Sequence, residues 1–124
     1  MPHISKRKLD QKLLDKLYKK LLSVLGKASQ KQNFSLIFNE LFTNTEKIML
    51  AKRLAIILML SNNLPQDKIV NVLKVSPTTV AKTSLKIEIG KFTNILKIST
   101  KEKIDLEKII TFILTAGGLA PPMG

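Results

Sequence analysis

Apolar residues recur along most of this chain at steps of three and four, the spacing that places them on one face of an α-helix. The pattern is clearest over residues 5–25, where we predict a first helix that stops at Gly26. Its apolar stripe consists of Leu9, Leu13, Leu14, Leu17, Leu21, Leu22 and Leu25. A helix this amphipathic needs a partner surface, and in a small chain a second subunit can supply it.

A second helix is predicted over residues 32–42, where the apolar positions again follow helical spacing. These positions are Phe34, Ile37, Phe38, Leu41 and Phe42. Aromatic rings interleaved with basic residues are typical of single-strand nucleic-acid binders. Because no basic residue alternates with the rings here, we expect them to pack in the core.

A third helix is predicted over residues 44–61, behind the sequence Thr-Asn-Thr-Glu at 43–46. This is a capping box, in which the Thr43 hydroxyl caps the helix and Glu46 reaches back. The run Leu-Ala-Ile-Ile-Leu-Met-Leu that follows is apolar on nearly all sides, which marks a helix buried on most of its surface. Just before this run, Lys52 and Arg53 either extend along the surface or contact a phosphate or ligand.

Residues 65–88 have the pattern of a helix-turn-helix: a short helix, a tight turn and a second helix. In the first helix Ile69 and Leu73 are four residues apart and therefore share one face. Residues of the second helix that follow the same spacing are expected to pack back on this face and on Val75: Val80, Thr83 and Ile87.

The turn of this motif runs through Lys74 and Val75. Ser76 can cap the second helix with its hydroxyl, and Pro77 fits the first helical position, where a missing N–H has no consequence. Two positions depart from the common pattern. Val70 stands where a small residue is frequent, which requires slightly wider helix spacing, and Lys74 stands where glycine is frequent. We expect Lys74 to adopt a turn outside the left-handed region.

This packing leaves Thr78, Thr79, Lys82 and Lys86 pointing outward. Short hydroxyls near a helix N-terminus suit base edges, and the basic side chains that follow suit phosphates. The alternative interpretation is an ordinary helical hairpin with a solvated polar face.

Beyond Glu88 the helical pattern either continues weakly or stops near Gly90, and a further apolar cluster follows at 92–98. Ser-Thr-Lys-Glu at 99–102 is a second capping box, which predicts a last helix from there to about Thr115. The tail at 117–124 is expected to be poorly ordered.

The chain of 124 residues carries a formal charge of +12 and has a pI near 10.1, so its field attracts polyanions, of which nucleic acid is the commonest. Nine basic residues against two aspartates give residues 1–33 a charge of +7. The alternative explanation of this charge is a lysine-rich surface that serves solubility.

The length and apolar content favour one folded domain over 1–124, and the absence of cysteine excludes a disulfide framework. The basic start lacks a secretory signal's apolar region, and the most apolar run is too short to span a bilayer, so we expect a cytoplasmic protein with no membrane partner.

Two segments resemble the Trp-repressor-like helix-turn-helix family: Leu-Ala-Lys-Arg at 50–53 and Lys-Val-Ser-Pro-Thr-Thr-Val-Ala-Lys at 74–82. The second matches most firmly at Ser76, Thr79 and Val80, and the resemblance covers residues 34–86. It implies an all-α fold, in which two chains intertwine through their N-terminal helices as a homodimer. It also implies that Thr78, Thr79 and Lys82 face DNA.

We therefore predict a sequence-specific DNA-binding transcriptional regulator that acts as a homodimer on double-stranded DNA, with the second helix of the motif in the major groove. The predicted DNA-binding residues are Ser76, Thr78, Thr79, Lys82, Thr83, Lys86, Gln66 and Lys68, and Arg53 and Lys52 are candidates for a ligand or phosphate contact. The resemblance does not extend to a tryptophan site, because Lys82 lacks the planar, bidentate grip of arginine on a carboxylate. No cofactor or metal is predicted.

The alternative function is a helical assembly or adaptor protein, or an RNA-binding protein, without sequence-specific DNA readout. An enzyme is not predicted. The sole histidine, His3, stands near the N-terminus and is a poor general base. The carboxylates Glu102, Asp105 and Glu107 alternate with lysines, as in a salt-bridged surface. The chain also has no phosphate-binding glycine loop, nucleophile elbow or metal-ligand spacing.

Overall fold

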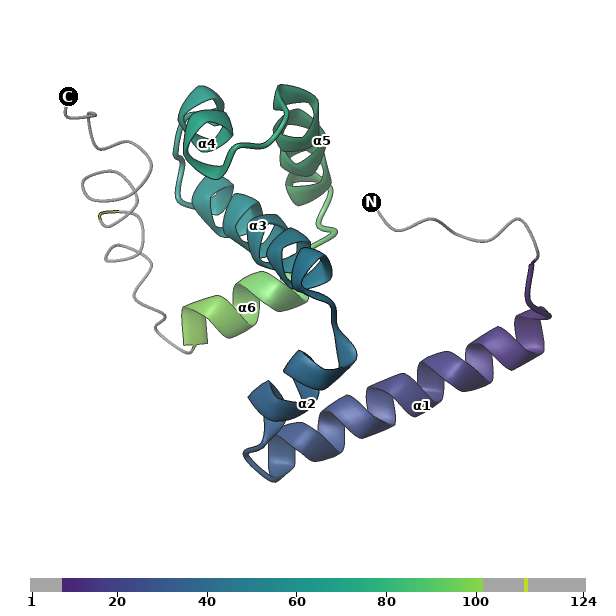
Figure 1. The fold of residues 1–124 in the computed structure, drawn as a ribbon. Helices are drawn as coiled ribbons and strands as arrows, with labels where there is room; N and C mark the ends of the chain where they lie inside the picture. The colour runs from purple at the N-terminus through teal and green to yellow at the C-terminus, as the bar shows by residue number, and fades with distance from the viewer. Residues whose placement is uncertain (1–7, 102–110, 112–124) are drawn as a thin grey trace. The chain divides into compact units, whose positions relative to one another are not determined.

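The computed structural model describes residues 8–101 and residue 111. The regular structure of this part of the chain is helical without strands, which confirms the predicted all-α fold (Figure 1). The helices are α1 (Gln11–Gln30), α2 (Phe34–Leu41), α3 (Asn44–Ser61), α4 (Gln66–Leu73), α5 (Pro77–Glu88) and α6 (Thr93–Lys101). The chain divides into two compact units, Met1–Glu46 and Lys47–Gly124. That residues 1–124 form one domain stays a prediction.

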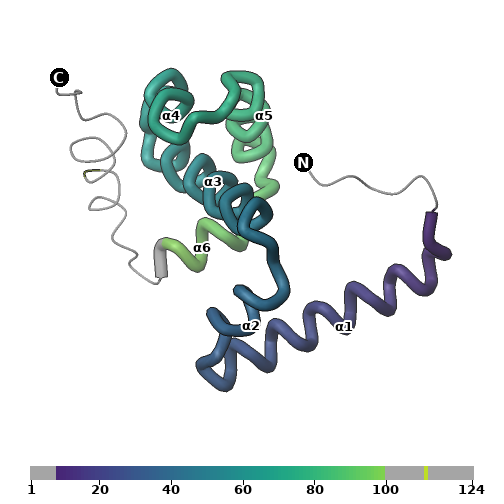
Figure 2. The backbone as a smooth tube through the Cα atoms, viewed as in Figure 1, coloured from purple at the N-terminus to yellow at the C-terminus, as the bar shows by residue number. Residues whose placement is uncertain are grey.

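In the first unit, α1 begins and ends later than its leucine pattern predicted. Residues 8–10 are not helical, and the Asp10 side chain caps the helix by accepting a hydrogen bond from the Leu13 N–H at 3.4 Å. At its other end α1 runs unbroken past Gly26 to Gln30 (Figure 2), so the predicted stop is wrong. A glycine costs only about 1 kcal/mol inside a helix, and the periodic pattern on both sides of Gly26 outweighs that.

The helices α1 and α2 pack against each other, but this contact buries little. Among the described residues of the first unit, Ala28 alone is fully buried. The rings of Phe34, Phe38 and Phe42 form a row along α2, with successive centroids 6.0 Å and 4.7 Å apart. No residue of α2 is buried, so within the first unit these rings pack on one another and do not form a buried core.

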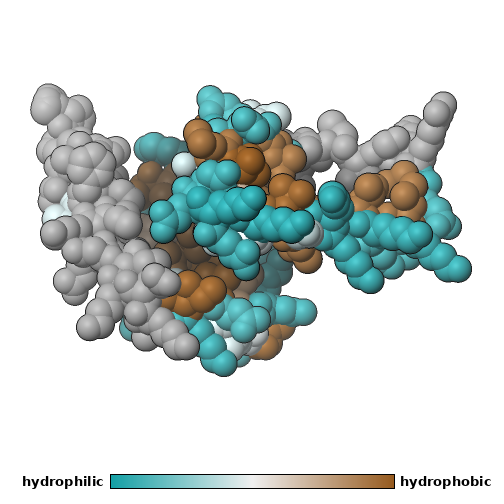
Figure 3. Space-filling model, turned by 90° about the horizontal axis from the view of Figure 1, so that it is seen from below, coloured by the Kyte–Doolittle hydropathy of each residue, from teal (hydrophilic) through white to brown (hydrophobic). Residues whose placement is uncertain are grey.

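The leucine stripe of α1 is largely exposed. Leu13, Leu17 and Leu22 expose 46%, 49% and 68% of their surface. At the right of Figure 3, where α1 runs, apolar side chains gather along one edge and polar side chains along the other. The amphipathic pattern is thus expressed in the helix, and within the first unit the contact with α2 leaves most of its apolar side uncovered.

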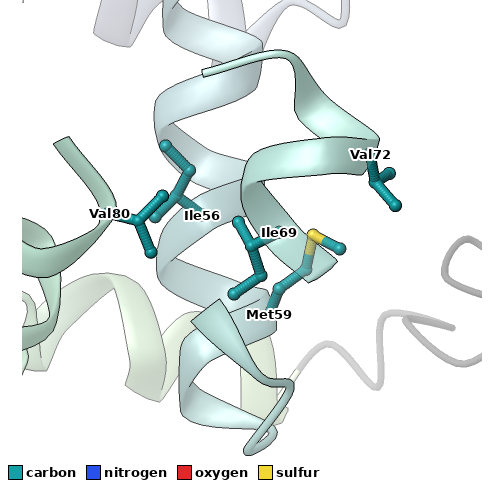
Figure 4. Packing of buried hydrophobic residues seen from close by; sticks show 5 residues of the cluster. All are labelled: Ile56, Met59, Ile69, Val72 and Val80. Atoms are coloured by element: carbon teal, nitrogen blue, oxygen red, sulfur yellow. The ribbon is translucent and has the colours of Figure 1, made fainter. Parts of the chain in front are cut away.

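The second unit contains a buried cluster contributed by three helices, and Figure 4 shows its members, with Val72 at the edge of the group. Ile56 and Met59 come from α3, Ile69 and Val72 from α4, and Val80 from α5. Partly buried apolar residues surround the cluster: Ala55, Leu60, Leu64, Val70, Leu73 and Val75. Four consecutive residues of α3, 56–59, are buried, which confirms the prediction from its apolar run.

The helix α3 begins as its sequence predicted. The Thr43 N–H donates to Glu46 Oε1 at 2.9 Å, and the Glu46 N–H donates to Thr43 Oγ1 at 3.1 Å, so the capping box is complete. Both the predicted start and the predicted end of this helix agree with the structure.

The helix α5 ends at Glu88, and Gly90 turns the chain with a φ of 80°. The helix α6 then continues through Ser99, whose hydroxyl donates to the Ile95 carbonyl at 3.0 Å. The prediction that Ser99 caps a new helix was therefore wrong. Inside a helix the hydroxyl of a serine donates to a carbonyl of the preceding turn and does not act as an N-cap. Apart from residue 111, the predicted last helix and the tail lie outside the described residues.

Candidate nucleic-acid interface

The helix-turn-helix occupies the residues that the sequence predicted. The helix α4 follows Pro65, α5 ends at Glu88, and the two helices contact each other beside α3. Val80 of α5 is fully buried in the cluster that α4 shares. Because one face of α5 is held in this way, the opposite face is directed to solvent.

The first turn of α5 is built around Ser76 and Thr79. Ser76 has extended backbone angles, and its Oγ accepts a hydrogen bond from the Thr79 N–H at 3.0 Å, which confirms the predicted cap. Pro77 occupies the first turn, as predicted. In addition, the two hydroxyl oxygens of Ser76 and Thr79 lie 2.8 Å apart and share a hydrogen bond.

This pairing limits what the two hydroxyls can offer to a ligand. Each hydroxyl has one proton and two acceptor sites, and the bond between Ser76 and Thr79 uses one of the two protons, whichever residue donates. One proton therefore remains free to donate at an exposed helix N-terminus. The pair acts as a single donor whose position is set by the cap, which is a property suited to reading a base edge.

The outer face of α5 carries Thr78, Lys82 and Lys86, which are all exposed. They are four residues apart and so form one line along the helix. The structure gives neither lysine an ion-pair partner among the described residues, so both charges are presented to solvent. On α4, Gln66 and Lys68 are also exposed, near the start of the helix.

Thr83 differs from the other predicted contact residues. It is half-buried, and its hydroxyl donates to the Thr79 carbonyl at 2.8 Å. The proton is thereby used within α5, so Thr83 retains only acceptor capacity toward a ligand.

The turn between α4 and α5 contradicts one expectation. Lys74 adopts the left-handed conformation, with φ 55° and ψ 52°, whereas we predicted a turn outside that region. The reason is the end of α4: a left-handed residue lets the Val75 N–H donate to the Val70 carbonyl at 3.3 Å. A residue with a Cβ pays roughly 1–2 kcal/mol for this conformation relative to glycine. Val70 itself is half-buried and packs against the core cluster.

The two basic residues of α3 have different surroundings. Lys52 is half-buried, and its Nζ donates to the Lys74 carbonyl at 3.4 Å. Arg53 is exposed and makes no hydrogen bond to the turn among the described residues. The structure thus joins Lys52 to the turn of the helix-turn-helix, and no sequence pattern marks this contact, which joins residues 22 positions apart.

A comparison with known protein families decides the relationship. The model of the family described as Trp repressor protein matches residues 16–100, which extends from within α1 to α6. This chain belongs to the Trp repressor family. Members of the family are regulatory DNA-binding proteins and not enzymes. No curated protein and no solved structure matches the chain.

In the described part of the chain no three histidine, aspartate or glutamate side chains are grouped closely enough to hold a metal ion. Within residues 8–101, no helix combines the length and the apolar character needed to cross a membrane. The histidine and carboxylates weighed as catalytic groups lie outside the described residues: His3, Glu102, Asp105 and Glu107.

Proposed function

We propose that this member of the Trp repressor family is a sequence-specific transcriptional regulator that binds double-stranded DNA as a homodimer. The helix α5 enters the major groove, with its N-terminus toward the base edges. The observation that carries the proposal is the exposed face of α5: one positioned hydroxyl donor at the start of the helix, then Thr78, Lys82 and Lys86 in line.

Within this face the residues have different roles. The Ser76–Thr79 pair and Thr78 lie in the first turn, where side chains of a recognition helix reach base edges. Lys82 and Lys86 lie one and two turns later and contact phosphates. Gln66 and Lys68 on α4 add contacts to the backbone, since phosphate contacts fix the register of a protein on the duplex. Thr83 contributes only as an acceptor.

The homodimer is proposed because α1 has an apolar side that the first unit leaves largely exposed. A two-fold dimer presents two copies of α5 to two half-sites, so a palindromic operator is expected. The exposed stripe is equally compatible with a helical assembly or adaptor protein, and an RNA-binding protein is the remaining alternative. The absence of any preference for duplex DNA would favour these.

We propose further that tryptophan is not the effector. Lys82 is exposed and stands where the resemblance places an arginine, and a lysine ammonium cannot form the planar, bidentate pair with a carboxylate that a guanidinium forms. Saturation with tryptophan is expected to leave the affinity for DNA unchanged.

The decisive experiment is selection of bound sequences from a random pool of duplex DNA. A two-fold symmetric motif is expected. The affinity for the selected site should fall with salt at a log–log slope of about −0.9 per phosphate neutralised. A protein that fails to bind duplex DNA even at low salt would exclude the proposal.

Two matched variants test the assignment of α5. Thr79→Val keeps the shape of the side chain but removes the hydroxyl, so we expect the selected motif to lose information at one position in each half-site. Lys20→Ala removes a charge from α1, and we expect it at most to weaken binding to all sequences equally. If the two variants change affinity and sequence preference alike, α5 is not the recognition helix.

A further inference from the structure

A contact within the second unit connects α3 to the turn of the helix-turn-helix. Lys52 Nζ donates to the carbonyl of Lys74 at 3.4 Å, across 22 residues of sequence. Lys52 is half-buried, whereas Lys74 is exposed. The acceptor belongs to a residue that is itself unusual, because Lys74 is a non-glycine residue in the left-handed region.

The position of this carbonyl explains why an ammonium is favourable there. Lys74 is the C-cap of α4, where helix carbonyls lack partners along the chain and the helix dipole is negative. A cation at this end satisfies a carbonyl and the dipole together. Lys74 also begins the short connection to Ser76, the cap of α5. The conformation of Lys74 therefore sets the direction in which the chain enters α5.

We propose that Lys52 is a positioning residue of the helix-turn-helix: it holds Lys74 in the left-handed conformation and thereby fixes the entry into α5. Glycine is the usual residue at such a turn, because it adopts positive φ without strain. Here the turn carries Lys74, and the hydrogen bond from the Lys52 ammonium of α3 offsets the strain of its left-handed conformation. For its effect on DNA the proposal rests on the proposed function, but its effect on the turn does not.

A double-mutant cycle on the protein without DNA tests whether Lys52 holds the conformation of the turn, with Tm as the measured quantity. Lys52→Met keeps the apolar stem and removes the donor, and we expect it to lower Tm by about 4 °C. Combined with Lys74→Gly, which adopts the left-handed conformation readily, the same change should lower Tm by less than half as much. Lys74→Ala is the matched control, because it removes the same charge but keeps the Cβ. In that background the effect of Lys52→Met should remain full. Equal effects in all three backgrounds would overturn the proposal.

DNA binding tests the consequence for α5. We expect Lys52→Met to weaken binding to the selected site about threefold to tenfold without changing the salt slope, since a positioning residue neutralises no phosphate. Lys82→Ala should reduce the magnitude of that slope by about 0.9. Lys74→Gly should restore most of the affinity lost in Lys52→Met.

The thermal measurements and the DNA-binding measurements distinguish a failure of this proposal from a failure of the proposed function. A reduced salt slope for Lys52→Met would make Lys52 a direct phosphate contact and overturn its positioning role. If the wild-type protein does not bind duplex DNA, the proposed function fails. The thermal cycle then still decides whether Lys52 holds the turn.

Discussion

The two units of this chain use the same helical periodicity with different results. In the second unit the apolar residues of α3, α4 and α5 meet, and Ile57, Met59, Ile69 and Val80 are essentially inaccessible to solvent. In the first unit the leucines of α1 and the phenylalanines of α2 have equally regular spacing, yet Ala28 alone among its described residues is buried.

The difference shows that periodicity specifies a helix and its apolar face but not what covers that face. The second unit contains three helices, α3, α4 and α5, that pack together within residues 44–88, so each apolar face finds a partner in the same chain. The first unit has two helices, and two helices cannot enclose a core. If the proposed dimer forms, a second copy supplies what the first unit lacks.

The largest expected effect breaks the core of the second unit. Ile69→Ala removes a side chain that exposes none of its surface, and we expect it to lower the free energy of unfolding by about 3 kcal/mol. Urea denaturation followed by circular dichroism measures the change. Leu36→Ala in α2, where 64% of the side chain is exposed, is the matched control and should cost less than about 1 kcal/mol. Comparable losses would mean that α2 is as well covered as α4.

A smaller effect is expected from the apolar stripe of α1. Leu17 exposes 49% of its surface, and burying this exposed surface in a dimer would stabilise association. Leu17→Ala should therefore weaken dimerisation by about 2 kcal/mol per dimer, a change in dissociation constant of about 30-fold. Sedimentation equilibrium over a range of concentrations measures this constant.

The neighbouring residue Lys16 provides the control for that variant, because it lies off the stripe and is exposed. Lys16→Ala should leave the dissociation constant unchanged. A wild-type protein that sediments as a monomer at all concentrations would show instead that the stripe has another partner.

The smallest expected effect sharpens the description of α1 itself. Gly26 lies inside the helix, and a Cβ added there would meet nothing within 4 Å. Gly26→Ala should therefore stabilise the protein by about 0.5–1 kcal/mol, seen as a higher Tm. A lower Tm would indicate that a partner approaches the backbone closely at Gly26.

The local signals in the sequence were predictive where a residue acts on its immediate neighbours. The Thr43–Glu46 box, the Ser76 cap and Pro77 in the first turn of α5 all function as their chemistry predicted. Local signals of this kind were wrong where the hydrogen bonds of a surrounding helix were stronger than the effect of one residue. Gly26 did not stop α1 and Ser99 did not start a helix, because each lies within a run of helical hydrogen bonds that one residue does not interrupt.

The candidate site shows the same division. The spacing of Thr78, Thr79, Lys82 and Lys86 was enough to place them on the outer face of α5, since Val80 is buried on the other side. The spacing could not reveal that the Thr83 proton is used inside the helix. Nor could it show that Ser76 and Thr79 share one hydrogen bond, because hydroxyl rotation depends on the folded geometry.

The sequence by itself determined that this chain is all-α, where the helix-turn-helix lies and which side of α5 faces outward. These properties follow from helical periodicity and from caps that act over three or four residues. Only the tertiary structure decided that Lys74 takes the left-handed conformation and that Lys52 reaches its carbonyl. Such a contact depends on how α3 and α4 cross. That crossing is set by the packing of Ile56, Met59 and Ile69, and no local pattern encodes it.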